Sequence, residues 1–113
     1  MSRFEEKVRK YVRASEAMGL ELDDALIAAT ARSLGPAIFL VDQEKVDCGD
    51  RADLAKIRES FLKKRAGLEV ADAELDRAVN EICRDLGGTD QRIYRALVCA
   101  MLVKRFALED AIA

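Results

Sequence analysis

Apolar side chains recur at every third or fourth position along most of the chain, the spacing that places them on one face of an α-helix. The first such run follows Ser2, which forms a capping box with Glu5, and continues to about Met18. Gly19 follows, where many helices end in a left-handed residue. The pattern therefore predicts a first helix over residues 2–18.

A second periodic run begins at Asp23 or Asp24 and stops at the pair Gly35 and Pro36. Proline has no backbone N–H and cannot continue a helical ladder, so this boundary is sharply defined. Proline also suits the first turn of a new helix, and the apolar residues 38–41 are predicted to form a short one. A short strand is the alternative, because so brief an apolar run cannot be assigned by its period.

Acidic residues mark the next two helix starts. Asp50 is predicted to cap a helix that ends at Gly67, with the cations of residues 63–65 in its last turn, where the helix dipole favours them. Asp72 is predicted to open a further helix that ends before Gly87.

The last long run is predicted to form a helix from Thr89 to about Phe106. Residues 96–103 are apolar on every side, so this helix should be surrounded by the others. The sequence as a whole predicts an all-α fold, a compact bundle of five main helices plus one short helix. We expect this bundle to be a single domain of residues 1–113, with the C-terminal helix, about 90–106, at its centre.

Composition agrees with a packed protein: half of the 113 residues are hydrophobic and 35% are charged. The first residues lack a secretory h-region, and the apolar run of residues 96–103 is too short to span a bilayer. We therefore expect a cytoplasmic protein with no membrane partner. Acidic segments (21–53 and 66–90) alternate with basic ones (54–65 and 91–106), which favours complementary neighbouring helices or self-association.

The reactive side chains favour a non-catalytic protein without a cofactor. Cys48, Cys83 and Cys99 are odd in number and widely spaced, so we expect reduced, mostly buried thiols. The chain has no histidine, which removes the usual general base at neutral pH.

The segment 42–53 is rich in acids, and Asp42, Asp47 and Asp50 are its candidate metal ligands. Their register does not match a calcium loop, and the cysteine-rich or histidine-rich sets that transition metals prefer are absent from the sequence. Helix capping by Asp50 and Asp53 is the favoured explanation.

Thr89, Arg92 and Arg95 form a candidate anion site. They follow a glycine pair at the predicted start of the last helix, where free backbone N–H groups can bind an anion. The helix dipole disfavours guanidinium groups at this end, so their position there needs another explanation. Ion pairs with acids such as Asp85 or Asp90 are the structural alternative, and we favour them.

The sequence offers candidate contact residues for two kinds of macromolecular partner, nucleic acid and protein. The basic end of the helix after Asp50 could contact nucleic acid, but no binding motif appears and aromatic residues are few, so nucleic acid is an unlikely partner. Phe39, Tyr94 and Phe106 are candidates for an apolar surface that contacts another protein or a second copy of the chain.

Four short stretches carry a resemblance: Gly35-Pro-Ala-Ile-Phe-Leu40, Phe61-Leu-x-Lys-x-x-Gly67, Tyr94-Arg-Ala96 and Leu102-Val-Lys-Arg-Phe106. With them the chain resembles a family of small, single-domain bacterial proteins of unknown function. The resemblance implies a helical bacterial protein and supplies no activity. The helix order is more loosely similar to tellurite-resistance B-like domains, some of which present acidic residues to metal ions, but their acidic patterns are not matched here.

The sequence thus favours a non-catalytic cytoplasmic interaction or regulatory module. The alternative is a small-anion or nucleotide-phosphate binding domain that uses Thr89, Arg92 and Arg95.

Overall fold

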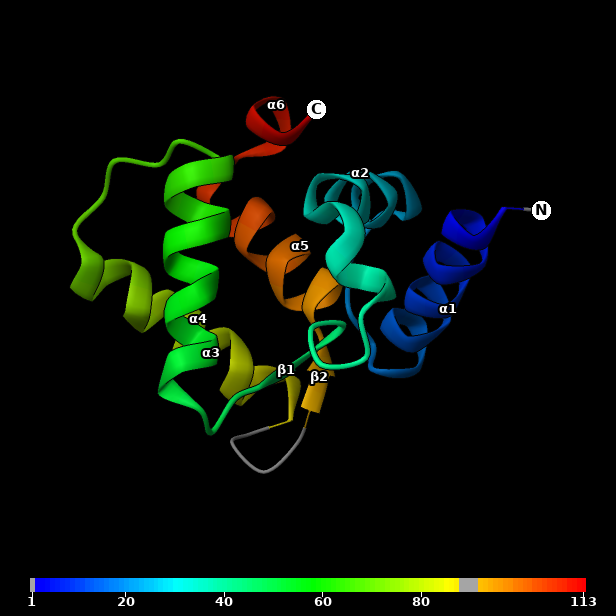
Figure 1. Ribbon diagram of the computed structural model, residues 1–113, viewed down its shortest axis with the longest axis horizontal. Helices are drawn as coiled ribbons and strands as arrows, with labels where there is room; N and C mark the ends of the chain where they lie inside the picture. Colours follow the sequence, from blue (N-terminus) through cyan, green and yellow to red (C-terminus); the bar gives the residue numbers. More distant parts are fainter. Residues whose placement is uncertain (1, 88–91) are drawn as a thin grey trace.

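The protein is a mostly helical globule with one small β-ribbon (Figure 1). The computed structural model describes residues 2–87 and 92–113. Within them the elements follow in the order α1 (Arg3–Ala17), α2 (Asp24–Leu34), the 3₁₀-helix η1 (Gly35–Phe39), β1 (Lys45–Asp47), α3 (Arg51–Lys56), the π-helix η2 (Ile57–Arg65), α4 (Asp72–Leu86), β2 (Arg92–Tyr94), α5 (Arg95–Phe106) and α6 (Glu109–Ile112). The predicted helical fold is confirmed.

Two of the predicted side-chain caps form, at Ser2 and Asp50, whereas Asp23 precedes α2 without a side-chain cap bond. The backbone N–H of Glu5 donates to Oγ of Ser2 at 3.1 Å, and that of Ala52 donates to Oδ1 of Asp50 at 2.9 Å. Gly19 adopts a φ of 71°, the left-handed conformation expected after α1. These local signals set both ends of α1 and the start of α3.

The predicted start of the last helix is wrong. Arg92–Tyr94 forms strand β2, which pairs antiparallel with β1, and α5 begins only at Arg95. Val46 and Ile93 face each other in this ribbon, and both are buried among apolar side chains while their strand neighbours are more exposed. This period of two favours extended backbone, but three residues are too few to reveal it in the sequence.

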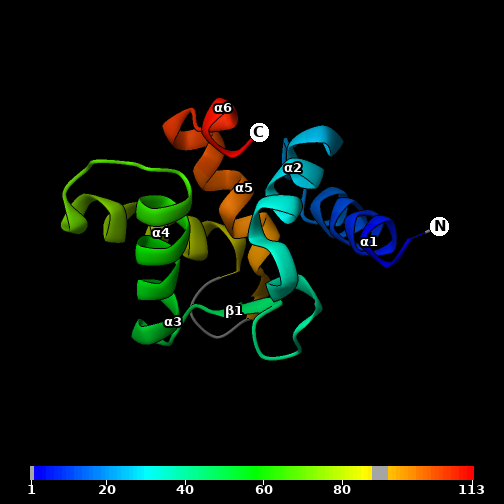
Figure 2. The ribbon, with the colours of Figure 1, turned by 45° about the horizontal axis from the view of Figure 1, so that its top comes forward.

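Helix α5 is the central element, as predicted. It lies between α1 and α2 on one side and α3 and α4 on the other, and both views agree on this (Figures 1 and 2). Two apolar clusters meet on it. The α4 cluster is built around Leu62, Leu75, Val79, Ile82, Val98, Leu102 and Val103, and the α1 cluster consists of Tyr11, Ile27, Ala31, Ile38, Ala96 and Leu97.

The predicted single helix from Asp50 to Gly67 changes its winding partway. After α3 the chain continues as the π-helix η2, in which hydrogen bonds span five residues; at its end the N–H of Ala66 donates to the carbonyl of Phe61 at 2.8 Å. π-helical segments are rare and frequently occur at functional sites. The helical period of the sequence does not distinguish this winding from an α-helix.

The expectation of three reduced cysteines is wrong for two of them. Cys48, just after β1, forms a disulfide with Cys83 of α4, with their Cα atoms 5.9 Å apart. The two lie 35 residues apart in sequence, so only the folded chain reveals their proximity. Cys99 is free and buried, as expected.

Within residues 2–87 and 92–113, no helix combines the length and apolar character that a bilayer crossing requires.

Candidate anion-binding pocket

Arg95 is the most buried basic residue that the structure describes, at 7% exposure. Its Nε donates to the carbonyl of Gln43 at 2.7 Å, and its Nη2 donates to Oδ1 of Asp53, also at 2.7 Å. The backbone N–H of Arg95 donates to the carbonyl of Glu44. These bonds hold the guanidinium in one orientation and fasten the turn before β1 to the start of α5.

Asp53 completes this arrangement. Burial opposes ionisation of its carboxyl group, but hydrogen bonds from Arg95 and from the backbone N–H of Asp47 outweigh burial and lower the pKa. Asp53 is therefore ionised at neutral pH and balances the charge of Arg95.

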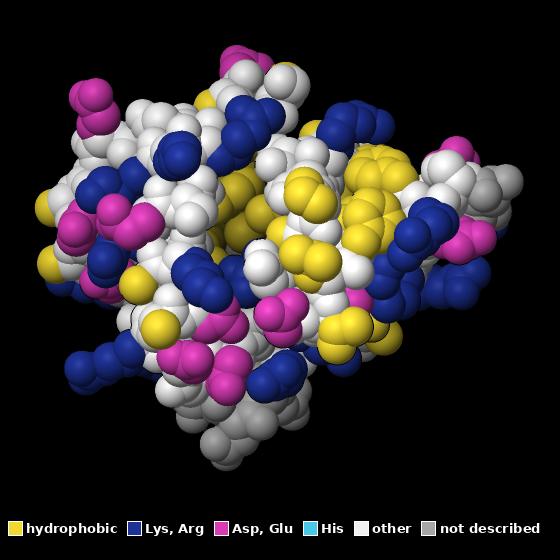
Figure 3. Space-filling view, viewed as in Figure 1, with side chains coloured by type: hydrophobic (Ala, Val, Ile, Leu, Met, Phe, Trp, Pro, Cys, Tyr) yellow, Lys and Arg dark blue, Asp and Glu magenta, His cyan; other side chains and the backbone are white. Residues whose placement is uncertain are grey.

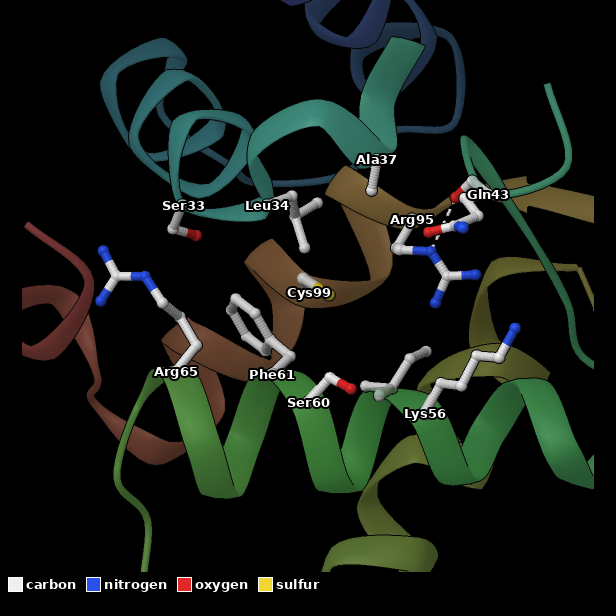
Figure 4. A pocket seen from close by; sticks show the side chains of 11 residues that line it. Ser33, Leu34, Ala37, Gln43, Lys56, Ser60, Phe61, Arg65, Arg95 and Cys99 are labelled. Carbon is white, nitrogen blue, oxygen red and sulfur yellow. Dashed lines mark hydrogen bonds between the residues drawn. The ribbon is translucent and has the colours of Figure 1, made fainter. Parts of the chain in front are cut away.

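Arg95 lines a pocket of about 220 Å³. Helices α2 and η1 bound it on one side, the end of α3 and η2 bound it on the other, and α5 lies behind it (Figure 4). Its polar lining consists of Ser33, Gln43, Lys56, Ser60, Arg65 and Arg95, and its apolar lining consists of Leu34, Ala37, Ile57, Phe61 and Cys99. On the surface it is a hollow with a hydrophobic floor and basic side chains at its edge (Figure 3).

The charge of the pocket lining has one sign. Lys56, Arg65 and Arg95 are cations, and no carboxylate is among the described residues that line the pocket. The chain as a whole has a net charge of −2, so this hollow departs from the average character of the protein. Cations around a partly apolar hollow attract an anion and give it a low-dielectric contact surface.

Cys99 forms part of the pocket wall. Burial raises the pKa of its thiol to about 12, and the positive charge of Arg95 only partly opposes this effect. The thiol is therefore protonated at neutral pH and acts as a small apolar surface rather than as a nucleophile.

The predicted anion site at the start of the last helix is divided by the ribbon. Thr89 lies outside the described residues. Arg92 is exposed on β2 and lines a separate, smaller depression of about 140 Å³, whereas Arg95 opens α5 and lines the pocket. The sequence reasoning identified Arg95 but missed its pocket partners Lys56 and Arg65, which belong to the basic segment weighed for nucleic acid.

The three candidate metal ligands, Asp42, Asp47 and Asp50, line the same depression as Arg92. Asp50 caps α3, and Oδ1 of Asp47 accepts from the backbone N–H of Gly49 at 3.0 Å. Two of the three thus have structural roles. Among the described residues no group of three or more acidic or cysteine side chains is arranged to hold a metal ion.

The three candidate contact residues do not share one cluster. Phe39 and Tyr94 pack against the α1 cluster, and Phe106 packs against the α4 cluster. Cations cover two of the rings: Arg3 lies 5.1 Å from the centroid of Phe39, and Lys10 lies 5.1 Å from that of Tyr94. Whether any of them contacts a partner stays a prediction.

Glu44 fastens α1 to the rest of the molecule. Its Oε2 accepts from the hydroxyl of the buried Tyr11 at 2.7 Å and from Nζ of Lys7 at 2.8 Å, and Lys10 lies 3.2 Å away. Burial works against its charge, but these bonds together lower the pKa of Glu44. Because the carbonyl of Glu44 also accepts from Arg95, α1 is tied to the turn that borders the pocket.

The fold and pocket together define a small mostly-α domain with a basic hollow beside its central helix. The chain belongs to the family described as "Protein of unknown function (DUF2853)", which it matches over residues 6–110. The predicted resemblance to a small family of unknown function is thereby confirmed. A comparison with curated proteins gives no match. The looser likeness to tellurite-resistance B-like domains stays a prediction.

Proposed function

We propose that this protein is a non-catalytic module that binds a small anion in the pocket between η1 and η2. The observation that carries the proposal is the lining itself: three cations, two serine hydroxyls and no carboxylate among the described residues surround a hollow of about 220 Å³. This proposal moves the anion site predicted from the sequence away from Thr89 and Arg92 and keeps Arg95.

The reactive groups support a binding role over a catalytic one. The chain has no histidine, the thiols of Cys48 and Cys83 are joined, and the thiol of Cys99 is protonated at neutral pH. Asp53, the acid that pairs with the pocket residue Arg95, is ionised, and its Oδ1 accepts a hydrogen bond from Arg95. A pre-oriented guanidinium whose only described carboxylate partner, Asp53, is held in an ion pair suits recognition of a charge rather than proton transfer.

Ligand-induced stabilisation tests the proposal. An anion at about 100 times its Kd raises the unfolding free energy by about 2.7 kcal/mol. For 113 residues this shift corresponds to about 10 °C in Tm. Thermal unfolding should be followed with formate, acetate and inorganic phosphate at constant ionic strength, so that general salt effects cancel.

The variants are chosen to leave the fold intact. Lys56→Gln removes an exposed pocket cation, and Lys64→Gln removes an exposed cation of the same helical segment that does not line the pocket. Stabilisation that Lys56→Gln abolishes and Lys64→Gln preserves supports the proposal. Equal stabilisation of both variants, or none of the wild type by any anion, refutes it.

Contact with a second copy of the chain is the other candidate function. Val41 is 94% exposed and the adjacent Leu40 is 44% exposed, side by side in the turn between η1 and β1. Two adjacent exposed aliphatic side chains offer a small apolar contact point for another surface. Light scattering during size-exclusion chromatography tests this idea: Val41→Asp should convert a dimer into a monomer, and a wild type that is monomeric at high concentration contradicts it.

A further inference from the structure

We infer that the ligand of the pocket is a monocarboxylate with a compact apolar body, the class represented by small ring acids. This inference rests on the proposed anion site and specifies its ligand. It follows from three properties of the pocket: the net charge at one end, the apolar middle, and the volume.

One end of the pocket carries a single net positive charge. Arg95 and Lys56 lie at this end, away from Arg65 (Figure 4). Asp53 cancels one of the two charges through its ion pair with Arg95. A carboxylate supplies one negative charge and so matches the net charge of this end, whereas phosphate carries more than one negative charge at neutral pH.

Arg95 is also prepared for a planar acceptor. Its bonds to Gln43 and Asp53 use two of its five N–H groups and fix the plane of the guanidinium. A fixed guanidinium with donors to spare favours a carboxylate, which accepts in one plane. Lys56 is exposed and flexible, so it can approach such a ligand as a point charge.

The middle of the pocket is apolar. Leu34, Phe61 and Cys99 lie between the Arg95 end and the Arg65 end (Figure 4). Cys99 is fully buried and Phe61 is 4% exposed, so a bare hydrated anion at Arg95 leaves chiefly the half-buried Leu34 in contact with water. Each methylene group of a ligand that is buried there raises the affinity by about fourfold, so an apolar body strengthens binding substantially.

The volume limits the size of that body. A cavity of about 150 Å³ accommodates benzene. The 220 Å³ of this pocket therefore has room for a six-membered ring together with one carboxylate group, but does not enclose a whole nucleotide. A larger molecule would have to extend past Arg65 into solvent.

Calorimetry with benzoate, its neutral analogue benzamide, formate and inorganic phosphate tests the inference on the full chain. We expect benzoate to bind at least tenfold more tightly than formate and at least tenfold more tightly than benzamide. Lys56→Gln should lower the affinity for benzoate by about tenfold, and Lys64→Gln should leave that affinity unchanged. Ala37→Leu, which fills the wall of the pocket, should abolish benzoate binding.

The outcomes separate the two proposals. Phosphate or formate that binds as tightly as benzoate overturns the inferred ligand class and leaves the anion site standing. If benzamide binds as tightly as benzoate, the negative charge of the ligand does not matter, and both the anion site and the inferred ligand class are overturned. Absence of binding by all four probes overturns both. Should Ala37→Leu fail to fold, the comparison of Lys56→Gln with Lys64→Gln still decides the result, because both side chains are exposed.

Discussion

Loss of the disulfide between Cys48 and Cys83 should destabilise the protein strongly. The bridge closes a loop across 35 residues and joins the end of β1 to α4. In the chain-entropy description, closing a loop of this length in the unfolded chain stabilises the folded state by about 4 kcal/mol. The unfolding entropy of about 2.1 cal/mol/K per residue over 113 residues then gives a fall in Tm of about 15 °C.

Calorimetric or circular-dichroism melting with and without a phosphine reductant measures this effect. Cys48→Ala combined with Cys83→Ala should melt about 15 °C below the oxidised wild type and should not respond to reductant. Cys99→Ala is the matched control, because it alters the free cysteine and leaves the bridge in place. Its melting temperature should still fall on reduction.

Alkylation provides an independent check of the bridge. The protein unfolded without reductant should take up one alkyl group, at Cys99, and after reduction it should take up three. Three alkyl groups without reductant, or a change in Tm of less than about 3 °C on reduction, would refute the reasoning. The same measurement on protein isolated under acid quench reports whether the bridge is oxidised in the cell.

Three further predictions concern buried polar groups. Because the folded pKa of Asp53 is lowered, its stabilising effect is present above its ordinary pKa of about 4 and is lost as the pH falls through the folded value. Asp53→Asn should therefore cost about 3 kcal/mol in urea unfolding at pH 7, where it leaves Arg95 unpaired, and progressively less as the pH is lowered below about 4; a cost that does not change with pH would contradict this. Tyr11→Phe should lower the unfolding free energy by about 1–3 kcal/mol because the hydrogen bond to Glu44 is lost. An unchanged unfolding free energy would show that this bond does not stabilise the fold. The thiol of Cys99 should resist a disulfide reagent in the native protein and react after denaturation, and rapid native reaction would show that it is not buried.

The helix boundaries were predictable because their signals are local. The capping residues Ser2 and Asp50 and the left-handed Gly19 lie next to the turns that they shape. Helix α5 was predictable as the centre for a similar reason, since a segment apolar on every side has no surface to give to solvent. Each of these inferences needs only neighbouring residues.

The ribbon, the disulfide and the pocket depend on residues far apart in sequence. Tyr94 pairs with Lys45 across the ribbon, and Arg95 forms an ion pair with Asp53, which lies 42 residues earlier in the sequence. The helical period that correctly predicted the end of the last helix also extended it through Arg92–Tyr94, because the burial of Ile93 fits either winding. Only the folded chain distinguishes them.

The shared position of α5 has a consequence for synthesis. Both apolar clusters draw on this helix, so neither can close until Ala96 to Val103 have left the ribosome. The helices that precede it emerge with their apolar faces uncovered, and such surfaces are prone to aggregate. The two apolar clusters of this protein are therefore completed together, once its last long helix has been synthesised.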